Sequence, residues 1–326
     1  MQRLSRGSPV RVGVASPRGG VDVCYVPTAW NSRSYARLAT RARDGRHDVR
    51  LGRGAPVAAA PSALQAFATR GRASALFRGG LPRGYRAVDP RTARRVPLTQ
   101  ALRPDAPLYP GDPPFTYDPA FTDTRTGSHE DGGYLLERVT SLGTHTGSSV
   151  SAPVHFLLGG CGLDELDERF ALMPLAVVDA RPRRATGDLP VEVGDLRRWE
   201  RRHGRFPNRG CVLLLTGLAS LFAEGSGSSS PYVTTPAPGF TGASVDWLFE
   251  QRQIFATGSD SLGPDATSDA TLRATTRTLG HGGITLENVG VGLAEMRPHG
   301  DWIAVNGNRP AFSGFPMGFT GFTLHR

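Results

Sequence analysis

The sequence predicts an α/β protein in which one domain follows an irregular N-terminal extension. From residue 93 to the end, short apolar runs of strand length alternate with helical stretches. Residues 1–92 are rich in Arg, Gly, Ala and Pro and show no sustained period of 2 or 3.6. We therefore place the domain at residues 93–326, and predict that residues 1–92 are disordered or follow a start codon assigned too early.

Four segments indicate three strands and a loop in this domain. Residues 134–142 (YLLERVTSL) and 175–180 (LAVVDA) have the length and apolar content of strands. Residues 210–217 (GCVLLLTG) form a continuous apolar run between glycines, as expected of a strand buried on both faces. Residues 225–242 are too rich in Gly, Ser and Pro to be regular, and long loops of this kind often line sites.

One helix is predicted in VGDLRRWERRHGRF, between the second and third of these segments. We expect Asp195 to cap its start and Gly204 to end it. The spacing then places Leu196 and Trp199 on the inward face, with the arginines in water.

The charge of the chain does not favour a nucleic-acid partner. The 326 residues carry a net charge of +9, and all 38 basic residues are arginine. The excess lies in residues 1–90, where 16 arginines face four acids, whereas residues 91–326 have 22 arginines and 25 acids. The predicted domain is therefore nearly neutral, and we expect no nucleic-acid partner.

Apolar runs and cysteines bear on where the chain resides. No apolar run approaches the roughly 20 residues of a membrane span, so we expect no membrane partner. The start lacks the apolar stretch of a secretory signal. Three cysteines are an odd and sparse number, which fits a reducing cytoplasm better than a disulfide framework.

The segment THTGSSVSAPVHF, residues 144–156, contains two histidines ten residues apart. Pro153 excludes a helical backbone before the second of them, so His145 and His155 could converge on one point. A stable catalytic zinc site normally has three protein ligands and an open position, and this segment supplies two.

This segment resembles the signature of the cyclase family that includes bacterial kynurenine formamidase. His145, Gly147, Pro153, His155 and Phe156 match that signature. The segments LTQALRPDAPLYPGDPPF and GSDSLGPD are also similar to the family, as is TLRATTRTLGHGGITLENVGVGL near the end. The resemblance covers about residues 96–326 and implies a mixed sheet wrapped by helices, with the site where residues 144–156 and 284–293 meet.

Several family ligand positions carry other residues in this chain. By the resemblance, His145, His155 and Glu287 keep metal-ligand positions, whereas Ser149, Ser151 and Thr276 stand where a histidine, an aspartate and a histidine are expected. The family typically holds two divalent ions. The retained set allows at most one divalent metal, zinc or manganese, on His145, His155 and Glu287, and we expect the metal site to be depleted or absent.

The retained groups allow more than one chemistry. With a metal, the resemblance implies amide or lactone hydrolysis, with N-formylkynurenine as the best-known substrate. Without a metal, His145 or His155 could act as a general base, Glu287 could orient it or act as an acid, and the three hydroxyls could bind an oxyanion. Ring closure of a polyketide-like molecule would use the same groups.

Two further interpretations stay open. A nucleophilic role for Ser149 or Ser151 is conceivable, although neither lies in a Gly-x-Ser-x-Gly elbow. A non-catalytic relative could instead keep the pocket for binding or serve as a partner subunit. We favour an arylformamidase-like hydrolase or metal-independent cyclase that acts on a small-molecule substrate. By the resemblance it should be a homo-oligomer, and we place it in the cytoplasm.

Overall fold

The structure is a computed structural model of the chain, and it describes residues 81–89, 92–118, 137–187 and 189–323. It also gives the backbone of three strands nearer the N-terminus, β1 (Pro9–Val12), β2 (Leu38–Arg43) and β3 (Arg46–Leu51). These strands pair antiparallel in the order β1-β3-β2. Most of the prediction for residues 1–92 lies outside the described residues and stays a prediction.

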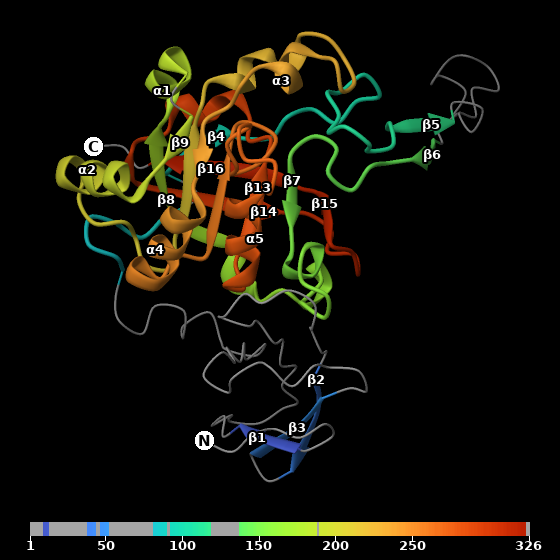
Figure 1. The fold of residues 1–326 in the computed structure, drawn as a ribbon, viewed down its shortest axis with the longest axis vertical. Helices are drawn as coiled ribbons and strands as arrows, with labels where there is room; N and C mark the ends of the chain where they lie inside the picture. Colours follow the sequence, from blue (N-terminus) through green and yellow to red (C-terminus); the bar gives the residue numbers. More distant parts are fainter. Residues whose placement is uncertain are drawn as a thin grey trace.

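A nine-stranded mixed sheet forms the body of the protein, in the order β15-β7-β13-β12-β10-β8-β14-β16-β4 (Figure 1). Its strands are β4 (Arg94–Pro97), β7 (Ser149–Ser151), β8 (Leu172–Asp179), β10 (Cys211–Leu215), β12 (Ala256–Ser259), β13 (Ile284–Glu287), β14 (His299–Asn306), β15 (Gly314–Pro316) and β16 (Gly318–Thr323). The four central strands β8, β10, β12 and β13 are parallel, and every other pairing is antiparallel. The carboxyl ends of the parallel strands therefore share one edge, where open α/β sheets usually bind ligands.

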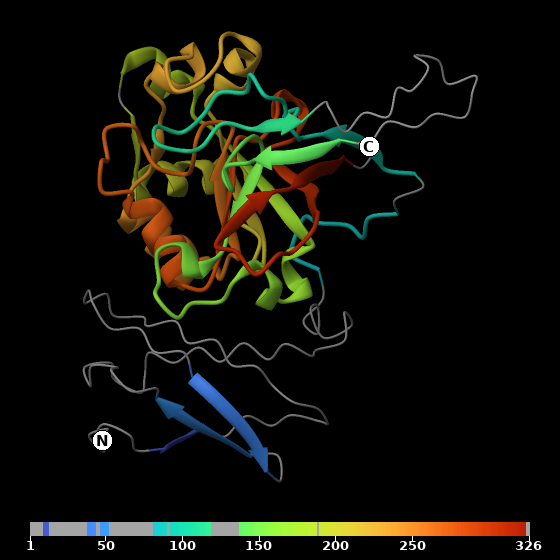
Figure 2. The same cartoon turned by 90° about the vertical axis from the view of Figure 1, so that its right-hand side faces the viewer.

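Helices cover one face of this sheet, as the side view shows (Figure 2). The α-helices are α1 (Arg181–Thr186), α2 (Val193–His203), α3 (Pro231–Thr234), α4 (Gly242–Arg252) and α5 (Arg273–Gly280). Side chains that alternate along β8 and β10, such as Val178 and Leu214, pack with Leu196 and Leu248 from α2 and α4. This packing buries the helix-facing side of the central strands.

The opposite face encloses a second core, because the sheet curls over itself. Leu175 and Leu213 of the central strands cluster there with Val150, Ile303 and Phe319 from the antiparallel strands. All five are buried. The outer strands thus take the place of a second helical layer.

The remaining elements are short. They are the paired strands β5 (Thr116–Asp118) and β6 (Arg138–Ser141), the paired strands β9 (Pro190–Val191) and β11 (Gly239–Phe240), and the 3-10 helices η5 (Pro153–His155), η6 (Leu163–Glu165), η7 (Glu168–Phe170), η8 (Leu218–Ala223) and η9 (Val291–Glu295). Strands β5 and β6 project away from the body (Figure 1).

The α/β prediction and most predicted elements are confirmed. The run of residues 211–215 is fully buried as β10, and 172–179 form β8. Of the predicted strand at 134–142, the described part contains β6. The loop predicted at 225–242 contains the single turn of α3 and the short β11.

The predicted helix is also confirmed, with one change at its start. Leu196 and Trp199 are buried, and Gly204 ends α2 at φ +95°. The cap is Glu192 rather than Asp195, because Asp195 is the third residue of the helix. Its side chain accepts a hydrogen bond from the Glu192 backbone N–H at 2.9 Å. Sequence patterns locate helix ends only to within a few residues.

Residues just before the predicted boundary contact the sheet. The Tyr85 hydroxyl donates to the Leu175 carbonyl at 2.7 Å, and the Trp302 indole donates to the Arg86 carbonyl at 2.9 Å. Tyr85 is 6% exposed. The boundary near residue 92 stays a prediction, but the packed part of the domain includes Tyr85.

No helix in the described part of the chain combines the length and apolarity that a bilayer crossing requires. Cys161 is disulfide-bonded, and Cys211 is free and buried. A disulfide at Cys161 weakens the argument from the cysteine count for a reducing compartment.

Candidate functional site

Two neighbouring antiparallel strands place four polar side chains on one face of the sheet. β7 pairs with β13 so that Ser149 lies opposite Glu287, and Ser151 lies opposite Thr285. Side chains two residues apart on a strand point the same way, and opposed residues are neighbours across the ladder. The residues between them, Val150 and Leu286, point to the other face and into the core. Alternation along both strands therefore brings these four polar side chains together in one cluster.

Glu287 accepts hydrogen bonds from the other three members of this cluster. Its Oε1 accepts hydrogen bonds from the hydroxyls of Ser151 at 2.5 Å and Thr285 at 3.1 Å. Its Oε2 accepts one from Ser149 at 2.8 Å and lies 3.1 Å from His145 Nδ1. A carboxylate has about four lone-pair positions, so every acceptor position of Glu287 is used.

His145 keeps Glu287 ionised. Burial works to raise the pKa of Glu287, but the charge and hydrogen bond of His145, with the bonds from Ser151 and Ser149, outweigh burial and lower the pKa to about 2. Burial works to lower the pKa of His145, but the charge and hydrogen bond of Glu287 outweigh it and raise that pKa above its usual 6.5. The two groups form a buried ion pair when His145 is protonated.

His155 lies against His145 with the opposite tendency. It ends η5, which Pro153 starts, and its ring centroid lies 4.3 Å from that of His145. Burial and then the charge of His145 lower the pKa of His155 below 6.5. At pH 6.5 the pair therefore consists mainly of a neutral His155 beside a cationic His145. Environments that push two pKa values apart commonly separate an acid from a base.

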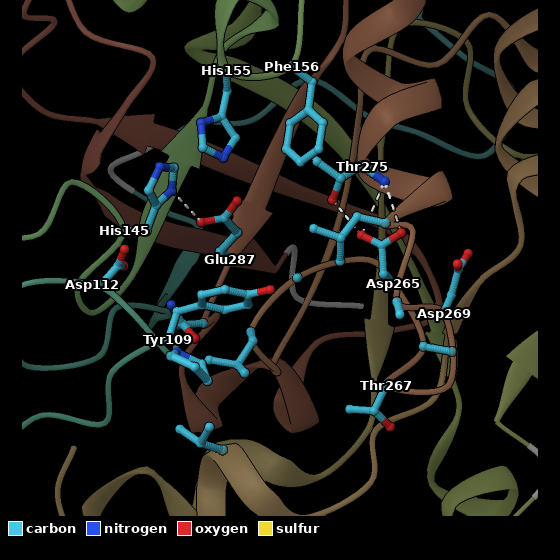
Figure 3. A pocket seen from close by; sticks show the side chains of 18 residues that line it. Tyr109, Asp112, His145, His155, Phe156, Asp265, Thr267, Asp269, Thr275 and Glu287 are labelled. Carbon is cyan, nitrogen blue, oxygen red and sulfur yellow. Dashed lines mark hydrogen bonds and ion pairs between the residues drawn. The ribbon is translucent and has the colours of Figure 1, made fainter. Parts of the chain in front are cut away.

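A cavity of about 560 Å³ opens in front of these groups (Figure 3). His145, His155 and Glu287 line one end, and Asp265 and Thr275 lie across the cavity from them. Its apolar wall includes Tyr109, Phe156, Val233, Leu262 and Leu272. The volume is within the range of small-molecule sites.

Asn288 joins the two predicted segments behind the cavity. It adopts a left-handed conformation at φ +53°, and its side-chain amide donates to the Gly147 carbonyl at 2.6 Å. The Tyr232 hydroxyl donates to Asn288 Oδ1 at 2.8 Å, and the Ser148 hydroxyl donates to the Asn288 carbonyl at 2.7 Å. The segments at 144–156 and 284–293 therefore meet as expected.

Of the six predicted site residues, the structure brings five together and leaves out Thr276. Thr276 is buried in α5, and it is not among the residues that line the cavity. Its neighbour Thr275 lines the cavity and donates a hydrogen bond to Asp265 Oδ2 at 2.5 Å. Successive helix residues are rotated by about 100°, so a shift of one position in the matched motif selects the wrong side chain.

The hydroxyls do not have the roles expected of them. Ser149 and Ser151 are fully buried, and the hydroxyl of each donates a hydrogen bond to Glu287. A hydroxyl has one proton to donate, so neither remains available to an oxyanion. Their burial also separates them from a substrate in the cavity, which argues against a nucleophilic serine. In this structure they position and stabilise Glu287.

Solved structures share this fold. Isatin hydrolase A from Ralstonia solanacearum is 24% identical and superposes with a TM-score of 0.60, covering 71% of this chain and 92% of its own. A structure described as a potential metal-dependent hydrolase with cyclase activity has a TM-score of 0.52 at 16% identity, covering 72% and 100%. At these identities the likeness establishes the fold.

Sequence comparison gives the family. The model of the family described as "Putative cyclase" matches residues 96–266, more than half of the chain, and the chain belongs to this family. A kynurenine formamidase from Bacillus mycoides is 25% identical over 199 residues, which span 61% of this chain and 83% of that protein. The resemblance stated from the motifs is therefore confirmed.

The residues of this site do not fit the divalent metal that the fold implies. The described residues contain no group of three His, Cys, Asp or Glu side chains arranged to hold a metal ion. Glu287, the carboxylate of the predicted set, already has all four acceptor positions filled by Ser149, Ser151, Thr285 and His145. Zinc would have to displace at least one of these partners to bind there.

Three residues of the site were missed in the sequence. Asp112 lines the cavity beside His145 (Figure 3), and Thr275 and Asn288 contribute as described above. Asp112 lies within the family-like opening segment, and Asn288 directly follows Glu287, so both residues lie in segments that the sequence already placed near the site. No local pattern marks an aspartate in a Pro- and Gly-rich loop as part of a distant pocket.

Proposed function

We propose that the chain is an enzyme that acts on a carbonyl group of a small aromatic or polyketide-like molecule. The reaction is hydrolysis of an amide or lactone, or the related ring closure. One observation carries this proposal, namely the contact of His155 with a His145 that is paired to the buried Glu287. The contact lies at the end of a cavity of suitable size.

His155 is the general base in this proposal. Its lowered pKa leaves it neutral near pH 7, and it lies on the exposed side of the pair. In hydrolysis it accepts a proton from water as the water oxygen bonds to the carbonyl carbon. In ring closure it removes a proton beside a carbonyl instead.

His145 is the general acid. Its raised pKa and its bond to Glu287 keep it protonated, with Nδ1 directed to the carboxylate. It donates a hydrogen bond to the carbonyl oxygen as negative charge develops there. When the bond between carbon and the leaving group breaks, His145 gives its proton to that group. The proton that His155 took then passes to His145, directly or through water, so the enzyme returns to its starting state.

Glu287 orients His145 and does not exchange protons. With a pKa of about 2 it stays ionised at every pH of interest, and three hydroxyls hold it in place. This role resembles that of a carboxylate that orients a catalytic histidine in other hydrolases.

The kynurenine formamidase relatives and isatin hydrolase neighbours suggest the first substrates to assay. These are N-formylkynurenine and isatin. We expect His155→Ala to lower kcat by about 10²- to 10⁴-fold, while the melting temperature changes little. His203→Ala, a change to an exposed histidine on α2, is the matched control and should keep full activity.

We further propose that this reaction needs no metal. Neighbours of the same fold are described as metal-dependent hydrolases, so the proposal requires a direct test. Elemental analysis after incubation with zinc or manganese should find far less than one ion per chain, and a chelator should leave turnover unchanged. About one ion per chain, with activity lost to chelator, would mean that His145, His155 and Glu287 rearrange into a metal site.

The alternative is a non-catalytic relative that keeps the cavity for binding or as a partner subunit. The replaced ligand positions support it. Absence of turnover with every formamide, lactam, lactone and linear polyketide mimic would favour it, and His155→Ala would then leave ligand binding intact.

We also propose that the protein is a homo-oligomer, as the family resemblance implies, and that it resides in the cytoplasm, as the start of the sequence and the cysteine count suggested. Light scattering of the purified protein measures its mass in solution, and a mass of one chain would contradict the first proposal. Fractionation of cells would test the second.

A further inference from the structure

The cavity is lined by acids and lacks arginine. Four carboxylates line it, from Asp112, Asp265, Asp269 and Glu287. Among its described lining residues there is no arginine, although the chain contains 38. The wall of the cavity therefore offers no fixed cation to an anionic ligand, apart from His145, whose charge is paired with Glu287.

Three of the four carboxylates are already satisfied by protein groups. Glu287 has the four partners described above. Asp265 accepts hydrogen bonds from the backbone N–H groups of Ala274 and Thr275 at the start of α5, and from the Thr275 hydroxyl. Asp269 Oδ2 lies 2.9 Å from Arg273 Nε. These acids have structural partners and need none from a ligand.

Asp112 differs from the other three. Its Oδ2 atom is buried, yet it has no hydrogen-bond partner among the described residues. Figure 3 shows the carboxyl group beside His145, at the same end of the cavity as Glu287. A buried acceptor without a partner is unfavourable. Because Asp112 also lines the cavity, its carboxyl group is the one of the four that a ligand hydrogen bond would serve.

We propose that the cavity selects a neutral or positively charged aromatic carbonyl compound whose amine, hydroxyl or amide N–H donates to Asp112, and that it discriminates against compounds of net negative charge. This inference rests on the proposed function, because it assigns the substrate class of the same site. The apolar wall of Tyr109, Phe156 and Leu262 holds the ring, and Asp112 is the specificity-determining residue at the reacting end.

Charge repulsion by Asp112 and the cost of desolvating a second carboxylate explain why the cavity should reject anionic ligands. A carboxylate on an anionic ligand in this cavity would face Asp112, and the one cation nearby, His145, is already paired with Glu287, so the contact is unfavourable for both carboxylates. A cationic amine would form a charge-assisted hydrogen bond with the Asp112 carboxylate. Specificity of this kind comes as much from rejecting the wrong ligand as from binding the right one.

The test uses three formanilides that differ at one ring position, where they carry an aminomethyl, a methyl or a carboxylate group. For the unaltered protein we expect kcat/KM to fall in that order, by about 100-fold between the two ends. Asp112→Asn should compress this range to about tenfold or less. Asp105→Asn removes an exposed acid outside the cavity and should preserve the full range.

Binding separates this inference from the proposed catalysis. The three corresponding anilines lack the formyl group, and calorimetry measures their affinities without turnover. Tighter binding of the aminomethyl compound, weakened in Asp112→Asn, would support the inference even if no formanilide were hydrolysed. Equal or tighter binding of the carboxylate compound by the unaltered protein would overturn it. Failure of all three anilines to bind would also overturn it, because the cavity would then not accept this class.

Discussion

Two buried carboxylates follow adjacent parallel strands, and they differ in charge behaviour. Glu287 ends β13, and Asp260 directly follows β12; they are 7% and 1% exposed. Asp260 accepts hydrogen bonds from the Thr216 N–H, the Thr216 hydroxyl and the Gly217 N–H, at 2.6, 2.7 and 2.8 Å. Burial nevertheless raises the pKa of Asp260, whereas the pKa of Glu287 is lowered to about 2.

The difference shows what neutral donors can and cannot do. Both acids accept several hydrogen bonds, but Glu287 is also paired with a histidine that can carry a charge, whereas the donors to Asp260 from Thr216 and Gly217 are neutral. Hydroxyls and amides offset part of the cost of burying a carboxylate, and a nearby cation offsets the remainder. Asp260 therefore fixes the turn after β10, while Glu287 can keep a histidine protonated for chemistry.

Removing the His145 imidazole should have the largest effect on activity. We expect His145→Ala to lower kcat by about 10²- to 10⁴-fold, because the acid is lost and Glu287 is left with neutral donors, as at Asp260. His281 pairs with Asp246 through Nε2 and Oδ1 at 2.8 Å, away from the cavity, so His281→Ala is the matched control. Full activity in His145→Ala would contradict the assigned role.

The two carboxylates should give opposite pH dependences of stability. The pKa of Glu287 falls from 4.5 to about 2 on folding, so its contribution, on the order of 3 kcal/mol, is present above pH 4.5 and lost as pH falls towards 2. The raised pKa of Asp260 acts in the opposite sense, since stability declines as pH rises from 3.8 through the folded pKa. Urea unfolding of the unaltered protein and of Glu287→Gln and Asp260→Asn between pH 2 and 7 measures each carboxylate's contribution, as the difference in unfolding free energy between protein and variant. If the two differences changed with pH in the same direction, the comparison would be contradicted.

The pH dependence of activity follows from the two histidines. A base with a pKa below 6.5 and an acid with a pKa above it predict a bell-shaped profile of kcat/KM with its plateau around pH 6.5. In His155→Ala the acidic limb should disappear from the residual activity. An unchanged acidic limb in that variant would assign the base elsewhere.

Displacing His145 without removing it should have a smaller effect. A Cβ atom at Gly314 would lie 2.5 Å from His145 Cε1 and 3.0 Å from its Nε2. Gly314 faces Ser151 across β15 and β7, so the missing side chain makes room for the ring. We expect Gly314→Ala to lower kcat by about ten- to 100-fold, with KM less affected, and to shift the basic limb of the pH profile.

Gly318→Ala is the control for this change, because its nearest atoms are at 3.5 Å, an ordinary contact distance. It should leave both kcat and the pH profile unchanged. Equal effects of the two substitutions would mean that Gly314 acts through general packing rather than through His145.

Removing one neutral donor should have the smallest effect. We expect Ser151→Ala to reduce the free energy of unfolding by about 1.5 kcal/mol at pH 7, because an ionised carboxylate loses a hydrogen bond. Thr216→Val should cost less than Ser151→Ala once Asp260 is protonated at low pH, since a neutral acceptor binds the donor more weakly. Chemical unfolding of both variants at pH 3 and pH 7 tests the difference.

Local patterns were sufficient for much of the fold. The apolar run of β10 and the inward face of α2 follow from periodicity and turn residues. The meeting of residues 144–156 with 284–293 was implied by the family resemblance. Each of these depends on residues close together in the sequence or on a motif long enough to match as a unit.

The tertiary structure decided which side chains meet and what they do. The register of β7 on β13 turned Ser149 and Ser151 from expected oxyanion donors into partners of Glu287. The rotation of α5 selected Thr275 in place of Thr276, and the loop around Asp112 brought an unsatisfied carboxylate to the cavity. Strand register and helix rotation depend on contacts between distant segments, and a one-residue shift changes the outcome, so residue types and local spacing could not determine them.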